Sequence, residues 1–410
     1  MILNNDSSSN MISLTKIAML ILTLGPILMW YKIQFPVSLG SALILFLSVF
    51  FMIRSRFNFR VLPWTFIPLF VYISGLWCIN NSFALWTLLP PGGWVFFIFV
   101  LGLFSGVYLF DMKLCKKYMK WTIWIAILLF WVQFVLLKTT GSQQFCFVPP
   151  LTPEFTYENM SYADLASQHV SSSYPCSIFL EKSYMAYYLV AYLCLTWFRG
   201  DNKNKMVSKE IAIIVLTLIF LKSGSGIVGL AILFAVKAFS IFWTHNIGRR
   251  VVMIILVIPL IIGIFYAYQS TDPGQEIFSR QEELFTEGTS GYTRVVAGYL
   301  IYDMLTPQEQ MIGKPDASEV FGKERDDGTI NFYINGVQTI LINLGYIGAL
   351  LYLLFYGSIF RRVSLSSKMC IIVLLAMALL ESNYLNSLML LLSIIPCADY
   401  FSIKKSKLTI

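Results

Sequence analysis

The stretch Ile178–Leu195, IFLEKSYMAYYLVAYLCL, is apolar and aromatic along nearly the whole length of a membrane span, yet two charged residues stand near its start. A transmembrane helix needs about 20 predominantly apolar residues. A charge inside such a segment costs about 2.5–3.5 kcal/mol on insertion scales, so it generally faces a polar cavity or a partner. Glu181 and Lys182 therefore predict a membrane helix whose end borders a polar site.

The composition of the whole chain extends this prediction from one helix to the protein. Of its 410 residues, 57% are hydrophobic and only 13% are charged. Soluble domains carry about 25% charged residues. The sequence therefore predicts an all-α polytopic integral membrane protein, with residues 1–410 as a single membrane domain.

The net charge of +8 is concentrated between the apolar segments. The basic clusters are Arg54, Arg56 and Arg60; Lys113, Lys116, Lys117 and Lys120; Arg199, Lys203, Lys205 and Lys209; Arg249 and Arg250; Arg361, Arg362 and Lys368; and Lys404, Lys405 and Lys407. Clusters of this kind in short loops mark the cytoplasmic side of a membrane protein. The positive charge is thus expected to orient the chain, and no nucleic acid is expected as a partner.

Apolar runs and basic clusters together predict the topology. Two of the runs, 211–243 and 369–402, have polar centres and basic residues on both sides, so each is expected to cross twice as a broken helical hairpin. The prediction is about 12 transmembrane helices, with both termini cytoplasmic and two long extracytoplasmic loops at 139–177 and 269–332. The other expected spans are 13–31, 35–53, 61–78, 94–110, 121–138, 178–198, 251–268 and 333–359.

The two long loops differ in character. The second is acidic, with twelve Asp and Glu against five Lys and Arg, and its segment SGYTRVVAGYLIYDML has helical periodicity. The first is bounded by Cys146 and Cys176, which form a disulfide in one interpretation if the loop is extracytoplasmic. No metal-ligand spacing, nucleotide-binding loop or hydrolase motif is present in the sequence, so neither a cofactor nor a catalytic metal is expected.

Charged residues on the predicted outer side are the candidates for chemistry. Glu181 either pairs with Lys182 or a neighbouring helix at the interface, or it positions and deprotonates a hydroxyl group. Arg280 and Arg294 lie in the second loop, and a guanidinium binds phosphate oxygens through two parallel hydrogen bonds. Arg294 falls within the apolar helical pattern, which makes a site role more plausible there than a solvated ion pair.

Two further residues carry open alternatives. Lys222 stands at the polar centre of FLKSGSG, where it is either an outward-side cation of the site or a side chain that reaches harmlessly to the interface. His169, in the first loop, is either a site residue or an ordinary surface histidine.

Four short motifs, in this order along the chain, resemble the bacterial O-antigen and capsular polysaccharide polymerases (Wzy type) and the related O-antigen ligases. They are FLEKSYMAYYL, LKSGSGIVGLAIL, SGYTRVVAGYLIYDML and INGVQTILINLGYIG. Lys182 stands where the family usually has Pro, and the second motif lacks the Arg that is frequent there. In the fourth motif Asn335 matches, whereas Ile334 replaces the His expected of the ligase branch.

The resemblance implies a GT-C-like membrane glycosyltransferase in the bacterial inner membrane, with its active site facing the periplasm. It would polymerise undecaprenyl-pyrophosphate-linked oligosaccharide repeat units, with the lipid bilayer and a chain-length regulator protein as partners. The residues implied are Glu181 and Arg294 as catalytic, and Arg280, Lys222, Tyr184, Asn335 and His169 as substrate-binding. A ligase and a polysaccharide-lipid transporter are the alternatives; a transporter predicts charges near helix midpoints in two matching halves, a pattern absent from this sequence.

Overall fold

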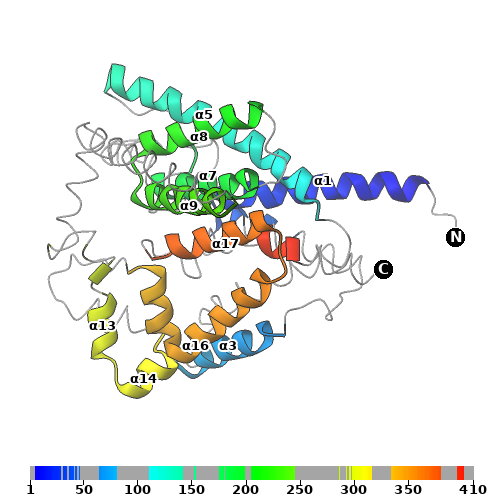
Figure 1. Ribbon diagram of the computed structural model, residues 1–410. Coiled ribbons are helices and arrows are strands. Elements are labelled where there is room, and N and C mark those ends of the chain that lie inside the picture. Colours follow the sequence, from blue (N-terminus) through cyan, green and yellow to red (C-terminus); the bar gives the residue numbers. More distant parts are fainter. Residues whose placement is uncertain are drawn as a thin grey trace.

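The computed structural model describes residues 5–28, 31–34, 37–40, 42–43, 46, 64–80, 110–141, 152–153, 175–179, 181–198, 205–244, 286, 292, 295–296, 298–315, 334–379 and 395–400. This part of the chain is mainly helical (Figure 1). The helices are α1 (Asn5–Leu28), α3 (Phe66–Asn80), α5 (Met112–Thr140), α7 (Lys182–Trp197), α8 (Lys205–Leu221), α9 (Gly224–Thr244), α13 (Gly298–Met304), α14 (Pro307–Ile312), α16 (Gly336–Phe360) and α17 (Leu365–Met377).

A small antiparallel sheet departs from the all-α prediction. Its strand order is β2–β1–β3, with β1 at Tyr31–Gln34, β2 at Val37–Ser38 and β3 at Thr152–Pro153. Helix α1 begins before the expected span 13–31 and ends at Leu28, before the end of that span, and β2 lies near the start of the expected span 35–53. Pro36 accounts for part of this difference, because a proline disfavours helical backbone at the residue before it.

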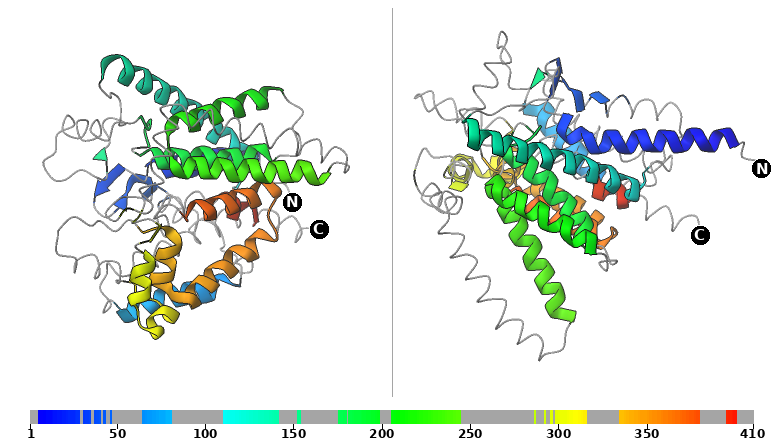
Figure 2. Two further views of the ribbon diagram at one scale, coloured as in Figure 1. Left: turned by 60° about the vertical axis from the view of Figure 1, so that its left-hand side comes forward. Right: turned by 90° about the horizontal axis from the view of Figure 1, so that it is seen from above.

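Helix α7 is the centre of the helical core. Its residues from Met185 to Leu195 are all buried, as expected for a helix that is apolar on every side. It packs against α17, α9, α8 and α5, and these helices surround it in Figures 1 and 2. Two buried tyrosines bind it to distant segments: the Tyr187 hydroxyl donates to the Met377 carbonyl at 2.9 Å, and the Tyr188 hydroxyl to the Thr23 carbonyl at 2.7 Å.

Glycines let α9 approach α7 closely. A Cβ atom on Gly226 would lie 2.9 Å from the Cβ of Ala186, and one on Gly229 would lie 3.0 Å from Val190. Small residues at such an interface bring two helix backbones together. Because the earlier glycine faces the earlier residue of α7 and the later glycine faces the later one, the two helices run in the same direction.

The predicted break in the stretch 211–243 is confirmed, because the chain forms two helices there, α8 and α9, separated at Lys222 and Ser223. Lys222 has φ 52°, in the left-handed region that costs about 1–2 kcal/mol for a residue with a side chain. The backbone N–H of Gly226 then donates to Ser223 Oγ at 3.4 Å, which caps the new helix.

Helix α16 is broken at Gly345, where φ is 62° and ψ is −172°. The freed carbonyl of Ile342 accepts from the backbone N–H of Lys314 at 2.7 Å, so the end of α14 takes up part of the lost helical bonding. We call α13, α14 and residues 336–344 of α16 the cap; it lies at the lower left of Figure 1. The cap has a hydrophobic cluster of its own: Ile301, Tyr302, Leu305, Ile334 and Ile342.

Two of the described helices, α5 with 29 residues and α16 with 25, are long and apolar enough to cross a membrane. Helix α5 also exposes an apolar stripe at helical spacing, which suits contact with lipid: Trp121, Ile125, Leu128, Val132 and Val135. One expectation about α5 is corrected, since the basic residues at 113–120 lie on its first turns and not in a loop. Asp111 starts the helix early by accepting from the backbone N–H groups of Lys113 and Leu114. The expected spans 94–110 and 251–268 fall almost entirely outside the described residues.

Candidate functional site

The first turns of α7, α9 and α16 and the last turn of α17 meet at one end of the helical core. Gly226 of α9 packs on Ala186 of α7, as described above, and the Tyr187 hydroxyl bonds to the end of α17. The backbone N–H of Gly336 donates to the Ala378 carbonyl at 2.8 Å, which joins the start of α16 to the same place. These ends lie together at the left of Figure 1, and we call this region the convergent end.

The convergent end brings together three residues that the sequence singled out, Glu181, Lys222 and Asn335. Glu181 precedes Ala186 by five residues, and Lys222 precedes Gly226 by four. Since α7 and α9 run in the same direction from the contact between Ala186 and Gly226, Glu181 and Lys222 lie on the same side of it. Asn335 lies beside the end of α17 through its neighbour Gly336.

Three helix starts in one region have an electrostatic consequence. The first N–H groups of a helix have no partners within it, and the aligned peptide dipoles give that end a partial positive charge. Such ends favour anionic ligands such as phosphate. The convergent end therefore combines three positive helix starts, the negative C-terminal end of α17, a lysine and a carboxylate.

Glu181 occupies the N-cap position of α7 without capping the helix. Its backbone is extended, at φ −142° and ψ 142°, and its side chain accepts no capping hydrogen bond from the backbone N–H groups of the first turn. Its Oε1 accepts instead from the Ser183 hydroxyl at 2.8 Å. The side chain is half-buried, and Oε2 has no hydrogen-bond partner among the described residues. Among the described residues, this carboxylate is therefore held at one oxygen, by the Ser183 hydroxyl.

The start of α9 adds hydroxyl groups to this end. The side chains of Ser223 and Ser225 are buried, and their Oγ atoms are 3.0 Å apart. Lys222, directly before them, is half-buried. This short segment thus offers one cation, two hydroxyls and the N–H groups of a helix start.

Asn335 caps α16 in a reciprocal arrangement with Gln338. Asn335 Oδ1 accepts from the backbone N–H of Gln338 at 2.9 Å, and Gln338 Oε1 accepts from the backbone N–H of Asn335 at 3.2 Å. Gln338 Nε2 also donates to the Val295 carbonyl at 2.8 Å. The side-chain oxygen of Asn335 is therefore occupied in holding the helix start, and Gln338 connects that start to the second long loop.

The remaining predicted residues have different outcomes. Tyr184 lies half-buried in the first turn of α7. Arg280, Arg294 and His169 lie outside the described residues, as does Cys146 of the predicted disulfide. Arg294 directly precedes Val295 in the sequence, and the Val295 carbonyl bonds to Gln338 one turn into α16.

Sequence reasoning missed two glutamines. Gln338 could have been found from the sequence, because Asn335 and Gln338 have the spacing of a capping box at a helix start. Gln133 lies within the apolar stretch FWVQFVLL, where a buried amide costs free energy unless it is hydrogen-bonded. Its side chain is fully buried and bonds to the backbone of Ser177, in the turn that precedes Glu181.

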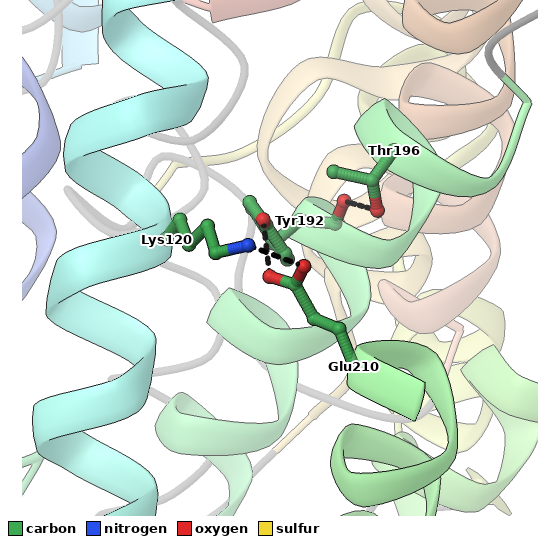
Figure 3. A network of polar contacts seen from close by, with 4 residues as sticks. All are labelled: Lys120, Tyr192, Thr196 and Glu210. Atoms are coloured by element: carbon green, nitrogen blue, oxygen red, sulfur yellow. Dashed lines mark hydrogen bonds and ion pairs between the residues drawn. The ribbon is translucent and has the colours of Figure 1, made fainter. Parts of the chain in front are cut away.

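A second polar cluster lies far from the convergent end. Glu210 Oε2 accepts from the Lys120 ammonium at 2.7 Å, and Glu210 Oε1 accepts from the Tyr192 hydroxyl at 2.7 Å (Figure 3). The Thr196 hydroxyl donates to the Tyr192 carbonyl at 2.9 Å. Glu210 begins the buried part of α8, and Lys120 belongs to α5, so this cluster joins the early turns of those helices to the last turns of α7.

The described residues contain no group of three or more His, Cys, Asp or Glu side chains arranged to hold a metal ion. The convergent end offers carboxylate, ammonium, hydroxyl and helix N–H groups. These suit an anionic, hydroxyl-bearing ligand. No model of a known protein family matches the chain, and no curated protein matches it.

Proposed function

We propose that this protein is a multi-pass glycosyltransferase of the bacterial inner membrane. It polymerises undecaprenyl-pyrophosphate-linked oligosaccharide repeat units into surface polysaccharide on the periplasmic face. The observation that carries the proposal is the convergent end, where Glu181 and Lys222 meet the starts of α7, α9 and α16. A pyrophosphate is stabilised by positive helix ends and a lysine. A sugar hydroxyl can donate a hydrogen bond to the Glu181 carboxylate.

The reaction is a displacement at the anomeric carbon of the growing glycan. A hydroxyl oxygen of the incoming repeat unit forms a bond to that carbon, while the bond from the carbon to the pyrophosphate oxygen breaks. Glu181 takes the hydroxyl proton as general base. Undecaprenyl pyrophosphate leaves, and Lys222, Arg294 and Arg280 stabilise the charge that develops on it. The sugar–phosphate bond supplies the driving force, so no nucleotide takes part.

The distribution of charge supports the orientation of the membrane domain. The basic first turns of α5 are joined to α8 through Lys120 and Glu210, and the short connection from α16 to α17 carries Arg361 and Arg362. Under the positive-inside rule these regions face the cytoplasm, and the convergent end then faces the periplasm.

Replacement of Arg294 and Glu181 tests the chemistry. Loss of one preorganised charged donor costs about 10²–10³-fold in rate. Cells with Arg294→Ala should therefore carry single repeat units on their surface lipid, although the protein is present at its normal level. Glu181→Gln should give the same result, because an amide cannot take the proton. Arg325→Ala, in the same loop, is the matched control and should leave long chains.

Other results would identify another function. Loss of all surface glycan, with lipid-linked units retained inside the cell, would indicate a transporter. Long chains that accumulate on undecaprenyl pyrophosphate would indicate a ligase. Normal long chains in Arg294→Ala and Glu181→Gln cells would refute the proposed site.

Topology is tested separately with engineered thiols. A membrane-impermeant reagent should label cysteines at Ser161 and Ser318 from outside but not cysteines at Asn204 and Ser364. Labelling at Asn204 from outside would contradict the predicted orientation.

A further inference from the structure

The turn that precedes Glu181 is held by the side chain of a residue 44 positions earlier. Gln133 of α5 makes two hydrogen bonds to the backbone of Ser177. Its Oε1 accepts from the Ser177 N–H at 2.8 Å, and its Nε2 donates to the Ser177 carbonyl at 3.1 Å. Both residues are fully buried. An amide side chain supplies the donor and the acceptor on two neighbouring atoms, which suits a pair of bonds to one residue's N–H and C=O groups.

The turn needs such a restraint, because its backbone is in an unfavourable conformation. Ser177 has φ 59°, which side-chain-bearing residues rarely adopt. The Phe179 N–H donates to the Cys176 carbonyl at 3.2 Å and closes the turn, and the Tyr31 hydroxyl donates to the Ile178 carbonyl at 3.1 Å. Two separate elements, α5 and β1, therefore fix consecutive residues of this one turn.

The restrained turn ends next to the carboxylate. Phe179 is fully buried and packs on the ring of Tyr188 at a centroid distance of 5.4 Å, and Glu181 follows two residues later. Because Glu181 does not cap its own helix, the path of the chain entering α7 determines where its carboxylate lies. Strained backbone that the surroundings hold in place is typical of functional sites.

We propose that Gln133 is a positioning residue for Glu181. Its amide holds Ser177 in the left-handed conformation, and this fixes the direction from which the chain enters α7. Gln133 acts on the carboxylate through this turn. The expected effect of Gln133 on turnover rests on the proposed function. Its effect on the conformation of the turn does not.

The kinetic test uses Gln133→Met. This substitution keeps the length of the side chain and removes the two hydrogen bonds to the Ser177 backbone. The substrate is the lipid-linked repeat unit extracted from cells that lack this protein. A displacement of about 1 Å at a reacting group can cost about 10²-fold, so kcat should fall by about that factor with little change in KM. Thr122→Val is the matched control, because Thr122 is also buried in α5, and its hydroxyl donates to the Tyr118 carbonyl and contacts the Tyr188 hydroxyl rather than the turn at Ser177.

Two further arms separate positioning from simple stabilisation. Adding Ser177→Gly to Gln133→Met should restore much of the kcat lost in Gln133→Met, because glycine adopts positive φ without steric cost. A thiol at position 181, introduced as Glu181→Cys, should react with a maleimide at a rate that Gln133→Met changes several-fold and Thr122→Val does not. The labelling arm needs no enzymatic activity. If the wild-type protein fails to extend the repeat unit, the proposed function is wrong, and labelling still decides the role of Gln133.

Three results would overturn the inference. The first is an unchanged labelling rate at position 181 in Gln133→Met. The second is an equal effect of Thr122→Val on kcat. The third is that neither Gln133→Met nor Gln133→Asn, which has a shorter amide side chain, accumulates in membranes, although Thr122→Val does. The amide would then be required for folding.

Discussion

The cluster of Lys120, Tyr192 and Glu210 predicts an unusual order of stabilities among its variants. The Glu210 side chain is 8% exposed, whereas that of Lys120 is 40% exposed. Removal of one partner from a buried ion pair costs about 3–5 kcal/mol, because it leaves an uncompensated charge. In Lys120→Met the buried carboxylate keeps only its hydrogen bond from Tyr192. The partial exposure of this pair lowers the expected cost to about 2–3 kcal/mol.

The double variant Lys120→Met/Glu210→Gln should be more stable than Lys120→Met alone. Glutamine keeps the shape of the side chain and an acceptor for the Tyr192 hydroxyl, and it removes the charge that Lys120 had balanced. Replacement of both members of a buried pair is often nearly neutral. We therefore expect the free energy of unfolding of the double variant to be about 1 kcal/mol below that of the wild type. We expect that of Lys120→Met to be about 2 kcal/mol below that of Lys113→Met. Lys113 is the control because it is exposed on the first turn of the same helix.

Unfolding of the full-length protein by sodium dodecyl sulfate in mixed micelles, followed by tryptophan fluorescence, measures these free energies. The four proteins of a double-mutant cycle isolate the interaction between Lys120 and Glu210. Additive effects of the two substitutions would refute the reasoning, because they would mean that the carboxylate needs no cation there. A Lys120→Met variant as stable as Lys113→Met would refute it as well.

Three other predictions concern backbone geometry and one cap. Gly345→Ala places a Cβ against the backbone oxygen of Met311 at a residue with φ 62°, so it should cost at least about 1–2 kcal/mol. It should also speed the hydrogen exchange of backbone amides in the cap. Gly226→Val forces α9 away from α7 and should cost about 1–3 kcal/mol in the same unfolding assay, whereas Gly224→Ala, which meets no atom within 4 Å, should cost none of this. A hydrogen bond from the backbone N–H of Thr306 and the nearby Lys314 lower the pKa of Glu309. The stability that Glu309 adds to α14 is therefore fully present above the usual pKa of a glutamate, about 4.3. It is lost as the pH falls through the lowered pKa. Hydrogen exchange of α14 between pH 3 and pH 6 should show this loss relative to Glu309→Gln, and an identical profile in that variant would contradict it.

Hydropathy and local motifs were sufficient to predict the elements that depend on local sequence. The run after Glu181 forms α7, and Lys222 and Ser223, in the polar centre of the next stretch, separate α8 from α9. Both predictions rest on neighbouring residues, because apolar length and small polar residues act within a few turns. The candidate residues on those segments are Glu181, at the N-cap position of α7, and Lys222, in the break before α9.

The geometry of the turn before Glu181 was beyond such reasoning, because it depends on residues far apart in the chain. Ser177 adopts positive φ through an amide that lies 44 positions away, and nothing in the sequence Cys176–Phe179 indicates it. The bend of α16 is similar: its glycine permits the break, and the backbone of Lys314 stabilises it. A hydropathy profile sees only one apolar run there.

Three polar residues inside or beside apolar runs were nevertheless informative. Gln133, Glu181 and Gln338 each interrupt or border an apolar stretch, and each contacts a segment distant from it or lies at the convergent end. The physical reason is the cost of burying an amide or a carboxylate without a partner, which is tolerated only where the fold supplies one. The identity of the partner follows only from the fold. In this chain two of those partners are the backbone groups of Ser177, four residues before Glu181, and of Val295, directly after Arg294, so both adjoin residues of the proposed site.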